Sequence, residues 1–191
     1  MLFTEGSFYH IYNRGNDKQN IFFQERNYAF FLQKVEKYIS SNADLIAWCL
    51  MPNHFHFLVH ANSSSTKIIK EKPIAINALT EGIRLLLSSY TKAIQKQESL
   101  TGNLFQQKTK FKCVDEYLTS AFHYIHQNPL RANLVDRLED WRWSSLPQYH
   151  GRDKSQLCKK EIAYKYVEVN WSRLLEESHL VIPEDQKVYI L

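Results

Sequence analysis

A pair of adjoining strands constrains the fold of this chain more than any other stretch of its sequence. Residues 45–50 (Leu-Ile-Ala-Trp-Cys-Leu) form a short apolar run that is typical of a buried strand. The turn Met51-Pro52-Asn53 follows, and residues 54–60 (His-Phe-His-Phe-Leu-Val-His) form a second strand. Strands that are joined by so short a turn pair antiparallel. The chain therefore contains a hairpin of an antiparallel sheet.

The pattern on either side of this hairpin predicts the remaining elements. We expect a strand at 8–13, an amphipathic helix at 25–40, a helix at 76–97, a short strand within 104–113, a helix that starts at Asp115 and ends at about Asn128, and one helix near 161–169. The helix at 115–128 should stop before Pro129, because the residue that precedes a proline disfavours the helical conformation. This order predicts an α+β fold of the ferredoxin-like split βαβ kind, an antiparallel sheet with helices on one face.

The length and composition suit one globular domain. A chain of 191 residues can bury a sizeable core but is short for two domains. We assign residues 1–150 to the domain that carries the function, and residues 151–191 to a C-terminal extension that packs on it or trails from it. No apolar run approaches the ~20 residues of a membrane helix, so no membrane partner is expected. The start of the chain does not resemble a secretory signal, and its three widely spaced cysteines predict a cytoplasmic location.

Positive charge is concentrated in the middle of the chain. The formal net charge is +4, yet residues 62–112 hold nine Lys or Arg and only three Glu. A basic surface of this kind suits a polyanion, although a solvated lysine-rich face explains the same pattern. The residues that we expect to contact DNA are Arg84, Lys92, Lys96, Lys108, Lys110 and Lys112. The last three alternate along one predicted strand, where they can equally serve to protect a sheet edge from aggregation.

His54 and His56 are the first candidates for chemistry. Residues two apart on a strand project from the same face, so the two imidazoles lie together while Phe55 and Phe57 enter the opposite side. Two neighbouring neutral imidazoles form a natural pair of metal ligands. The alternative is a pair of polar residues on a solvent-facing strand. His60 has the same orientation but lies at the end of the strand, where a structural role is the better interpretation.

Tyr124 and Asn128 form a second candidate group. They are four residues apart on a predicted helix and are therefore neighbours on its surface. A tyrosine hydroxyl with an amide oxygen one turn later can place a nucleophile beside a third metal ligand. A tyrosine at the edge of the core, with an asparagine that caps the helix end, explains the same residues without any chemistry.

Several segments, taken together, resemble the single-tyrosine HUH transposases and in particular their REP-associated branch. Residues 48–59 (Trp-Cys-Leu-Met-Pro-Asn-His-Phe-His-Phe-Leu-Val) are similar to the strand with the His-hydrophobe-His motif, and residues 124–135 (Tyr-Ile-His-Gln-Asn-Pro-Leu-Arg-Ala-Asn-Leu-Val) to the signature of the tyrosine helix. Residues 9–15 and 141–145 are also similar to that branch. Asn133 stands where the signature often has glycine, and asparagine can also adopt a positive φ. The resemblance covers roughly residues 8 to 150.

The resemblance implies a function and a set of roles. His54 and His56 would bind Mg²⁺ or Mn²⁺, with Asn128 as a polar third ligand, and Tyr124 would be the nucleophile. A phenol of pKa about 10 is protonated at neutral pH and needs help to attack phosphorus, which a bound metal supplies. Attack would leave the 5′ end of the DNA on the tyrosine and free a 3′-OH. The implied enzyme is a metal-dependent endonuclease and strand transferase that acts on single-stranded DNA beside a palindromic hairpin.

Two other hypotheses belong to different functional classes. The first is a non-catalytic nucleic-acid-binding module on the same fold, whose histidines are ordinary surface residues. The second is a metal hydrolase in which water attacks in place of Tyr124. Zinc competes with the harder ions on ligand type, whereas a weakly held asparagine favours Mg²⁺ or Mn²⁺. A homodimer and a monomer are both compatible with the sequence.

Overall fold

The structure is a computed structural model that describes residues 2–152, 156–180 and 182–190. Its strands are β1 (Phe8–Arg14), β2 (Asp44–Met51), β3 (His54–His60), β4 (Ile68–Lys70), β5 (Ile76–Asn77) and β6 (Lys110–Cys113). Its helices are α1 (Glu25–Val35), α2 (Ser63–Thr66), α3 (Ala78–Glu98), α4 (Leu118–Arg131), α5 (Leu146–Tyr149), α6 (Lys160–Tyr166), α7 (Leu174–Ser178) and α8 (Glu184–Ile190). Short 3₁₀ and π turns lie between them, among them a π turn at Glu36–Ser40 that extends α1.

The main sheet has four strands in the order β2-β3-β1-β6, and every neighbouring pair is antiparallel. Strand β3 lies between β1 and β2, which α1 connects, so the connection is a split βαβ unit. This arrangement confirms the predicted α+β class with an antiparallel, ferredoxin-like sheet. Strands β4 and β5 form a separate two-stranded sheet that the sequence pattern did not predict.

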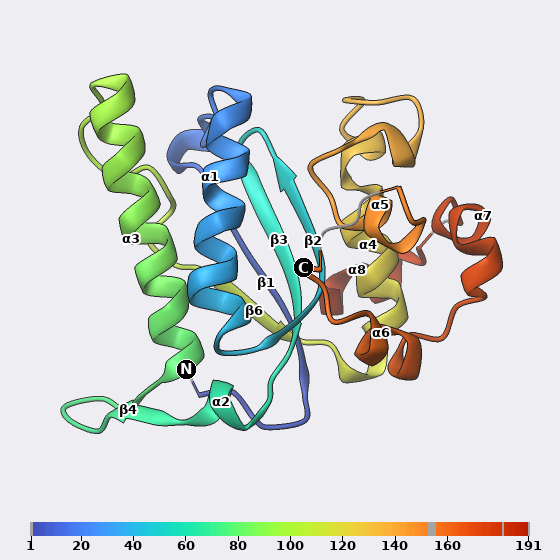
Figure 1. The fold of residues 1–191 in the computed structure, drawn as a ribbon, viewed down its shortest axis with the longest axis horizontal. Helices are drawn as coiled ribbons and strands as arrows, with labels where there is room; N and C mark the ends of the chain where they lie inside the picture. Colours follow the sequence, from blue (N-terminus) through green and yellow to red (C-terminus); the bar gives the residue numbers. More distant parts are fainter. Residues whose placement is uncertain (1, 153–155, 181, 191) are drawn as a thin grey trace.

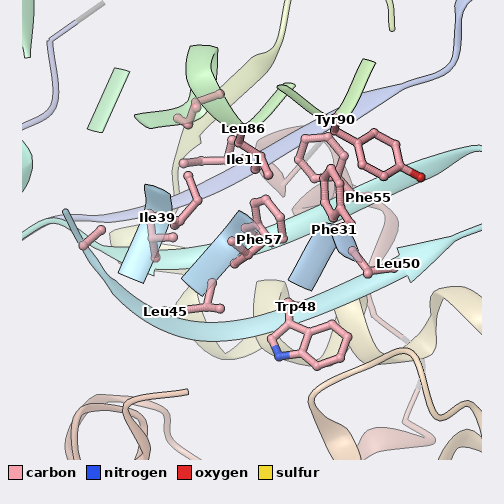
Figure 2. Packing of buried hydrophobic residues seen from close by; sticks show 14 of the residues in the cluster. Ile11, Phe31, Ile39, Leu45, Trp48, Leu50, Phe55, Phe57, Leu86 and Tyr90 are labelled. Atoms are coloured by element: carbon pink, nitrogen blue, oxygen red, sulfur yellow. The ribbon is translucent and has the colours of Figure 1, made fainter. Parts of the chain in front are cut away.

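One face of the sheet carries the larger aromatic core. Phe55 and Phe57 of β3 point to this face and contact Phe31 of α1, which in turn packs edge-on against Tyr90 of α3. Figure 2 shows these rings among the surrounding aliphatic side chains. Alternation along β3 therefore works as predicted, because the phenylalanines enter the core and the residues between them point away.

The opposite face of the sheet is covered as well, by α4 and the C-terminal helices (Figure 1). The sequence predicted helices on one face only, whereas the structure has helices on both faces. Cys49 and Met51 of β2 and Leu58 of β3 are apolar and fully buried on this second face, and they need a cover. The sequence does not reveal that both faces are buried, because a strand that is apolar on both sides shows no alternation of apolar and polar residues.

The C-terminal segment contributes to this second core. Its buried members are Ala163, Val167, Leu174, Ile182 and Ile190. The expected helix near 161–169 corresponds to α6, and α7 and α8 follow it without a clear signal in the sequence. Among the residues that the structure describes, no helix is long and apolar enough to cross a membrane.

Helix α4 differs from its prediction at both ends. Asp115 does not cap it, because its carboxylate accepts a hydrogen bond from the backbone N–H of Phe8 (2.5 Å), and α4 proper begins at Leu118. At the other end the helix continues through Pro129 to Arg131. The proline has no N–H for the carbonyl of Ile125, and the side-chain amide of Asn128 donates to that carbonyl instead (3.4 Å). Just beyond the helix, Asn133 has the anticipated positive φ of 51°.

Candidate active site

A cavity of about 380 Å³ opens where β1, β3 and α4 meet the segment that leads into β6. Its lining is polar and aromatic and includes three of the four residues predicted for chemistry, His54, His56 and Tyr124. The lining residues are Tyr12, Asn13, Arg14, His54, His56, Gln106, Lys108, Lys110 and Tyr124. Residues that are far apart in the sequence thus share one concave surface, which is the usual setting of an active site.

His54 and His56 reach this cavity from β3. Their ring centroids lie 5.0 Å apart, and across the β1–β3 ladder they stand opposite Arg14 and Tyr12. The strand alternation that sends Phe55 and Phe57 into the aromatic core sends both imidazoles to the α4 face. Their common orientation is therefore a consequence of the register that the core imposes.

The Nδ1 atom of His54 lies 2.6 Å from Oδ1 of Asn53, and because that oxygen can only accept, Nδ1 carries the proton. The pKa of His54 is lowered to about 4, chiefly by burial and also by the positive charge of Arg14, while a hydrogen bond with Asn128 acts in the opposite direction. The ring is neutral at neutral pH, and its Nε2 presents a lone pair.

His56 is buried, and its two ring nitrogens differ in their contacts. Its Nδ1 lies 2.8 Å from Nε2 of His10, whereas its own Nε2 is buried and has no hydrogen-bond partner among the residues that the structure describes. Burial holds the pKa of His56 well below its usual range, with His10, His54 and Arg14 as further causes. A buried polar atom without a partner costs free energy unless a ligand satisfies it. Nε2 of His56 is such an atom.

Tyr124 and Asn128 approach the histidines from α4. The ring of Tyr124 lies 5.8 Å from that of His56, centroid to centroid. Burial raises the pKa of Tyr124, while the guanidinium of Arg131, 5.8 Å from the centre of the ring, lowers it. Asn128 donates its amide N–H groups to the carbonyls of Tyr124 (2.9 Å) and Ile125, and it also hydrogen-bonds to His54. The structure therefore brings together all four residues that the sequence singled out for catalysis and metal binding.

The donors at this site fit a divalent cation. The unpartnered Nε2 of His56 is the observation that favours one, and the imidazole of His54 and the amide of Asn128 stand next to it. Within the described residues, no three His, Cys, Asp or Glu side chains gather into a metal cluster. A metal here would thus rely on two imidazoles and an amide oxygen, a set that leaves room for phosphate oxygens and water.

Three site residues were missed by reasoning from single residues: His10, Tyr12 and Arg14. They alternate along β1 and face α4, since Tyr12 pairs with His56 and Arg14 with His54. Nε of Arg14 is buried and finds no hydrogen-bond partner in the described part of the chain, so the guanidinium can still bind an anion. The only signal in the sequence was the resemblance of residues 9–15 to the transposase branch, because the pattern of β1 alone does not reveal which strand it pairs with.

The predicted DNA contacts divide into two groups. Lys108 and Lys110 line the cavity, and Arg84 and Lys92 line a groove of about 580 Å³. Asn13 and Gln106 belong to both linings and connect the two hollows. Arg84 is already held by Glu81, with Nε 2.7 Å from the carboxylate.

Other predicted contacts lie elsewhere. Lys96 lines a separate hollow beside Phe30. Lys112 of β6 pairs with His10 of β1 and lines neither the cavity nor the groove. Phe105 is buried against Phe55 and is therefore not free to stack on a base. His60 pairs with Asp44 at 3.1 Å, which agrees with a structural role.

Comparison with protein-family models and with curated protein sequences gave no match. Comparison with solved structures found a similar chain, described as the REP associates tyrosine transposase bound to a REP hairpin. The alignment covers 82% of this chain and 87% of the other, with a TM-score of 0.60 and 15% sequence identity. At this identity the likeness establishes a shared fold.

Proposed function

We propose that this protein is a metal-dependent, single-stranded DNA endonuclease and strand transferase whose nucleophile is Tyr124. One observation carries the proposal: in a cavity lined by lysine and arginine, a phenol lies beside a buried imidazole whose Nε2 has no partner within the described residues. The fold that it shares with a solved tyrosine transposase supports the same conclusion.

The metal would be Mg²⁺ or Mn²⁺, with His54, His56 and Asn128 as its protein ligands. When bound, it would offset the negative charge that develops on the phosphate during the reaction. The protein's own contribution is to keep both imidazoles neutral by burial and to hold each with Nδ1 engaged, so that the Nε2 atoms face the site. The amide N–H groups of Asn128 donate to the carbonyls of Tyr124 and Ile125, so its oxygen, which pairs with His54, is the atom of this side chain that would bind the metal.

The reaction is an exchange of one phosphodiester for another. The phenolic oxygen of Tyr124 forms a bond to phosphorus as the bond from phosphorus to the 3′-oxygen breaks. The phenol loses its proton and the leaving 3′-oxygen gains one, so the strand ends with a free 3′-OH and a 5′ end on the tyrosine. Burial raises the pKa of Tyr124 and so opposes the loss of that proton. The positive charge of Arg131 beside the ring lowers the pKa and favours the loss. The phosphotyrosine retains the energy needed for the reverse step, in which a 3′-OH rejoins the strand.

The substrate would be DNA with an unpaired segment beside a hairpin. Lys108 and Lys110 at the cavity neutralise the phosphates next to the scissile bond, and Lys92 and Arg84 extend the path along the groove by α3. The hairpin is suggested by the solved neighbour, which is described as bound to one. Because the ring of Tyr124 lies 5.8 Å from that of His56 within one molecule, Tyr124 would act on the metal site of its own chain, and a homodimer is not required.

Covalent capture tests this proposal. Short single-stranded hairpin DNA, labelled at its 3′ end, is incubated with the protein and Mn²⁺ and then separated under denaturing conditions. The wild type should retain the label on the protein, and Tyr124→Phe should lose it while still binding DNA. Tyr12→Phe is the matched control, because Tyr12 is the other phenol of the cavity.

Two outcomes contradict the proposal and identify its competitors. Cleavage without an adduct, retained in Tyr124→Phe but lost in His54→Ala, indicates a hydrolase that uses water. Binding without cleavage or adduct in the wild type indicates a non-catalytic module.

A further inference from the structure

His10 of β1 is not among the residues that line the cavity, yet it is hydrogen-bonded to His56, which is. It is completely buried and lies diagonally across the β1–β3 ladder from His56. Its Nε2 is 2.8 Å from Nδ1 of His56, and its Nδ1 is 2.6 Å from the backbone carbonyl oxygen of Ile190 in α8. The two imidazole rings are nearly parallel, with an interplanar angle of 23°. The three groups thus form one chain of hydrogen bonds that runs from α8 to the site.

The acceptor at the start of this chain fixes the direction of every bond in it. A carbonyl oxygen can only accept, so Nδ1 of His10 carries its proton and donates to Ile190. In a neutral His10 the other nitrogen, Nε2, is then an acceptor, and Nδ1 of His56 must donate to it. The remaining nitrogen of His56, Nε2, is left with a lone pair and no proton. This is the buried atom that lacks a partner.

We infer that His10 is a positioning residue that fixes the tautomer and the orientation of His56, so that Nε2 of His56 can bind a metal. The inference rests on the proposed function for the identity of the ligand, but the tautomer itself follows from the hydrogen bonds alone. Metal-binding histidines commonly donate their second ring nitrogen to a partner that orients the ring, and loss of such a partner weakens metal binding. Here the partner is a second histidine in place of a carboxylate.

The C-terminal helix α8 supplies the first acceptor of this chain of hydrogen bonds. The last carbonyls of a helix accept no hydrogen bond within the helix, so the Ile190 carbonyl can accept one from Nδ1 of His10. The side chain of Ile190 is fully buried in the second core, on the same face of the sheet as α4, which holds its backbone in place. A segment that carries no catalytic residue thereby sets the protonation pattern of the site.

Two substitutions of His10 separate this role from simple packing. The amide oxygen of glutamine reaches about as far from the backbone as Nε2 of the ring, so His10→Gln should keep the acceptor that Nδ1 of His56 needs. His10→Phe fills the same space without that acceptor. We expect His10→Phe to bind Mn²⁺ about 10- to 100-fold more weakly than the wild type and His10→Gln to bind it nearly as well. His123→Phe, at a buried histidine that contacts Ser178, is the control and should leave Mn²⁺ affinity unchanged.

The affinities are measured by titration with Mn²⁺ alone, without DNA, and thermal unfolding verifies that each variant folds. Nitrogen NMR of the metal-free protein gives a second readout that no packing defect mimics. His56 should carry its proton on Nδ1 in the wild type and in His10→Gln, and should move it towards Nε2 in His10→Phe. If the His10→Phe protein is unfolded, the wild-type and His10→Gln spectra decide the matter by themselves.

The outcomes also keep this inference apart from the proposed function. A wild-type protein with the proton of His56 on Nε2, or a folded His10→Phe protein with unchanged tautomer and Mn²⁺ affinity, overturns the role of His10 even when the DNA adduct forms. A wild-type protein with the expected tautomer but no adduct contradicts the proposed reaction and leaves the positioning role in place.

Discussion

At the scale of single residues, the histidines of the site are distinguished by what each ring nitrogen contacts. His54 and His56 were predictable as a pair, because spacing on a strand decides which face a side chain joins. Their environment was not predictable. The partners of the two Nδ1 atoms are Asn53, the neighbouring residue, and His10, which is 46 positions away. Only the register between β1 and β3 brings the second of these into place, and local sequence does not encode that register.

Arg14 acts on the two histidines through its charge. Its positive charge lowers the pKa of both His54 and His56, and by the same repulsion it opposes a cation at the site. Arg14→Gln should therefore bind Mn²⁺ more tightly than the wild type. It should also form the DNA adduct about 10²- to 10³-fold more slowly, because a donor to the charge on phosphorus is lost. Metal titration and single-turnover kinetics check the two effects. A variant in which both quantities fall would show that Arg14 only supports the fold.

At the scale of elements, the sheet and its first helices follow from sequence pattern, and the helix that carries Tyr124 does so only in part. The start and end of α4 depend on contacts made elsewhere. Asp115 binds the backbone of Phe8 instead of capping the helix, and Asn128 supplies a donor where Pro129 has none. The local rule that a helix stops before proline fails here because a side chain satisfies the carbonyl that the proline leaves open.

This substitution of a side-chain donor for a backbone one can be tested by a double-mutant cycle. Asn128→Ala should lower the free energy of unfolding by about 1 kcal/mol or somewhat more, since two carbonyls lose a donor. In a Pro129→Ala background, the new backbone N–H serves Ile125, and the cost of Asn128→Ala should shrink by about 0.5 kcal/mol or more. Denaturant unfolding of the four proteins measures the coupling. Strictly additive effects would contradict this explanation of the helix end.

At the scale of the whole molecule, the basic segment divides into residues that face the site and residues that do not. Charge counting could identify the segment, but the placement of each lysine depends on how α3 and β6 pack. Lys108 and Lys110 line the cavity, whereas Lys96 lies beside Phe30, away from both the cavity and the groove.

We therefore expect unequal effects on DNA binding. Replacement of Lys108 and Lys110 by alanine should weaken binding of single-stranded DNA and flatten the plot of log affinity against log salt by about 1.4, two contacts at about 0.7 each. Lys96→Ala should change neither quantity appreciably. Equal effects from the two sets of substitutions would indicate nonspecific attraction to a basic protein.

The buried histidines also make the whole fold sensitive to acid. Burial lowers the pKa of His10 to about 4 and that of His126 to about 3, whereas in an unfolded chain both titrate near 6.5. As the pH falls below about 6.5, the unfolded chain binds protons that the folded chain does not, so stability is fully present above that pH and declines down to about 4 for His10 and about 3 for His126.

Unfolding free energies at pH 7.5 and pH 5 should differ accordingly, with the lower value at pH 5. The glutamine variant His126→Gln should reduce the difference, because one of the titrating groups is gone. Equal stability at the two pH values would mean that these rings are not buried in neutral form.

The proposed reaction bonds the oxygen of Tyr124 to DNA, and peptide mapping of the adduct identifies the residue that carries the nucleotide. After reaction with hairpin DNA and Mn²⁺, nuclease and trypsin digestion should leave a 5′-phosphonucleotide on the peptide of residues 113–131, which fragmentation assigns to Tyr124 and not to Tyr117. We expect that mass on Tyr124 alone. A nucleotide on Tyr12, or none on any tyrosine of a protein that cleaves the DNA, would contradict the proposed reaction.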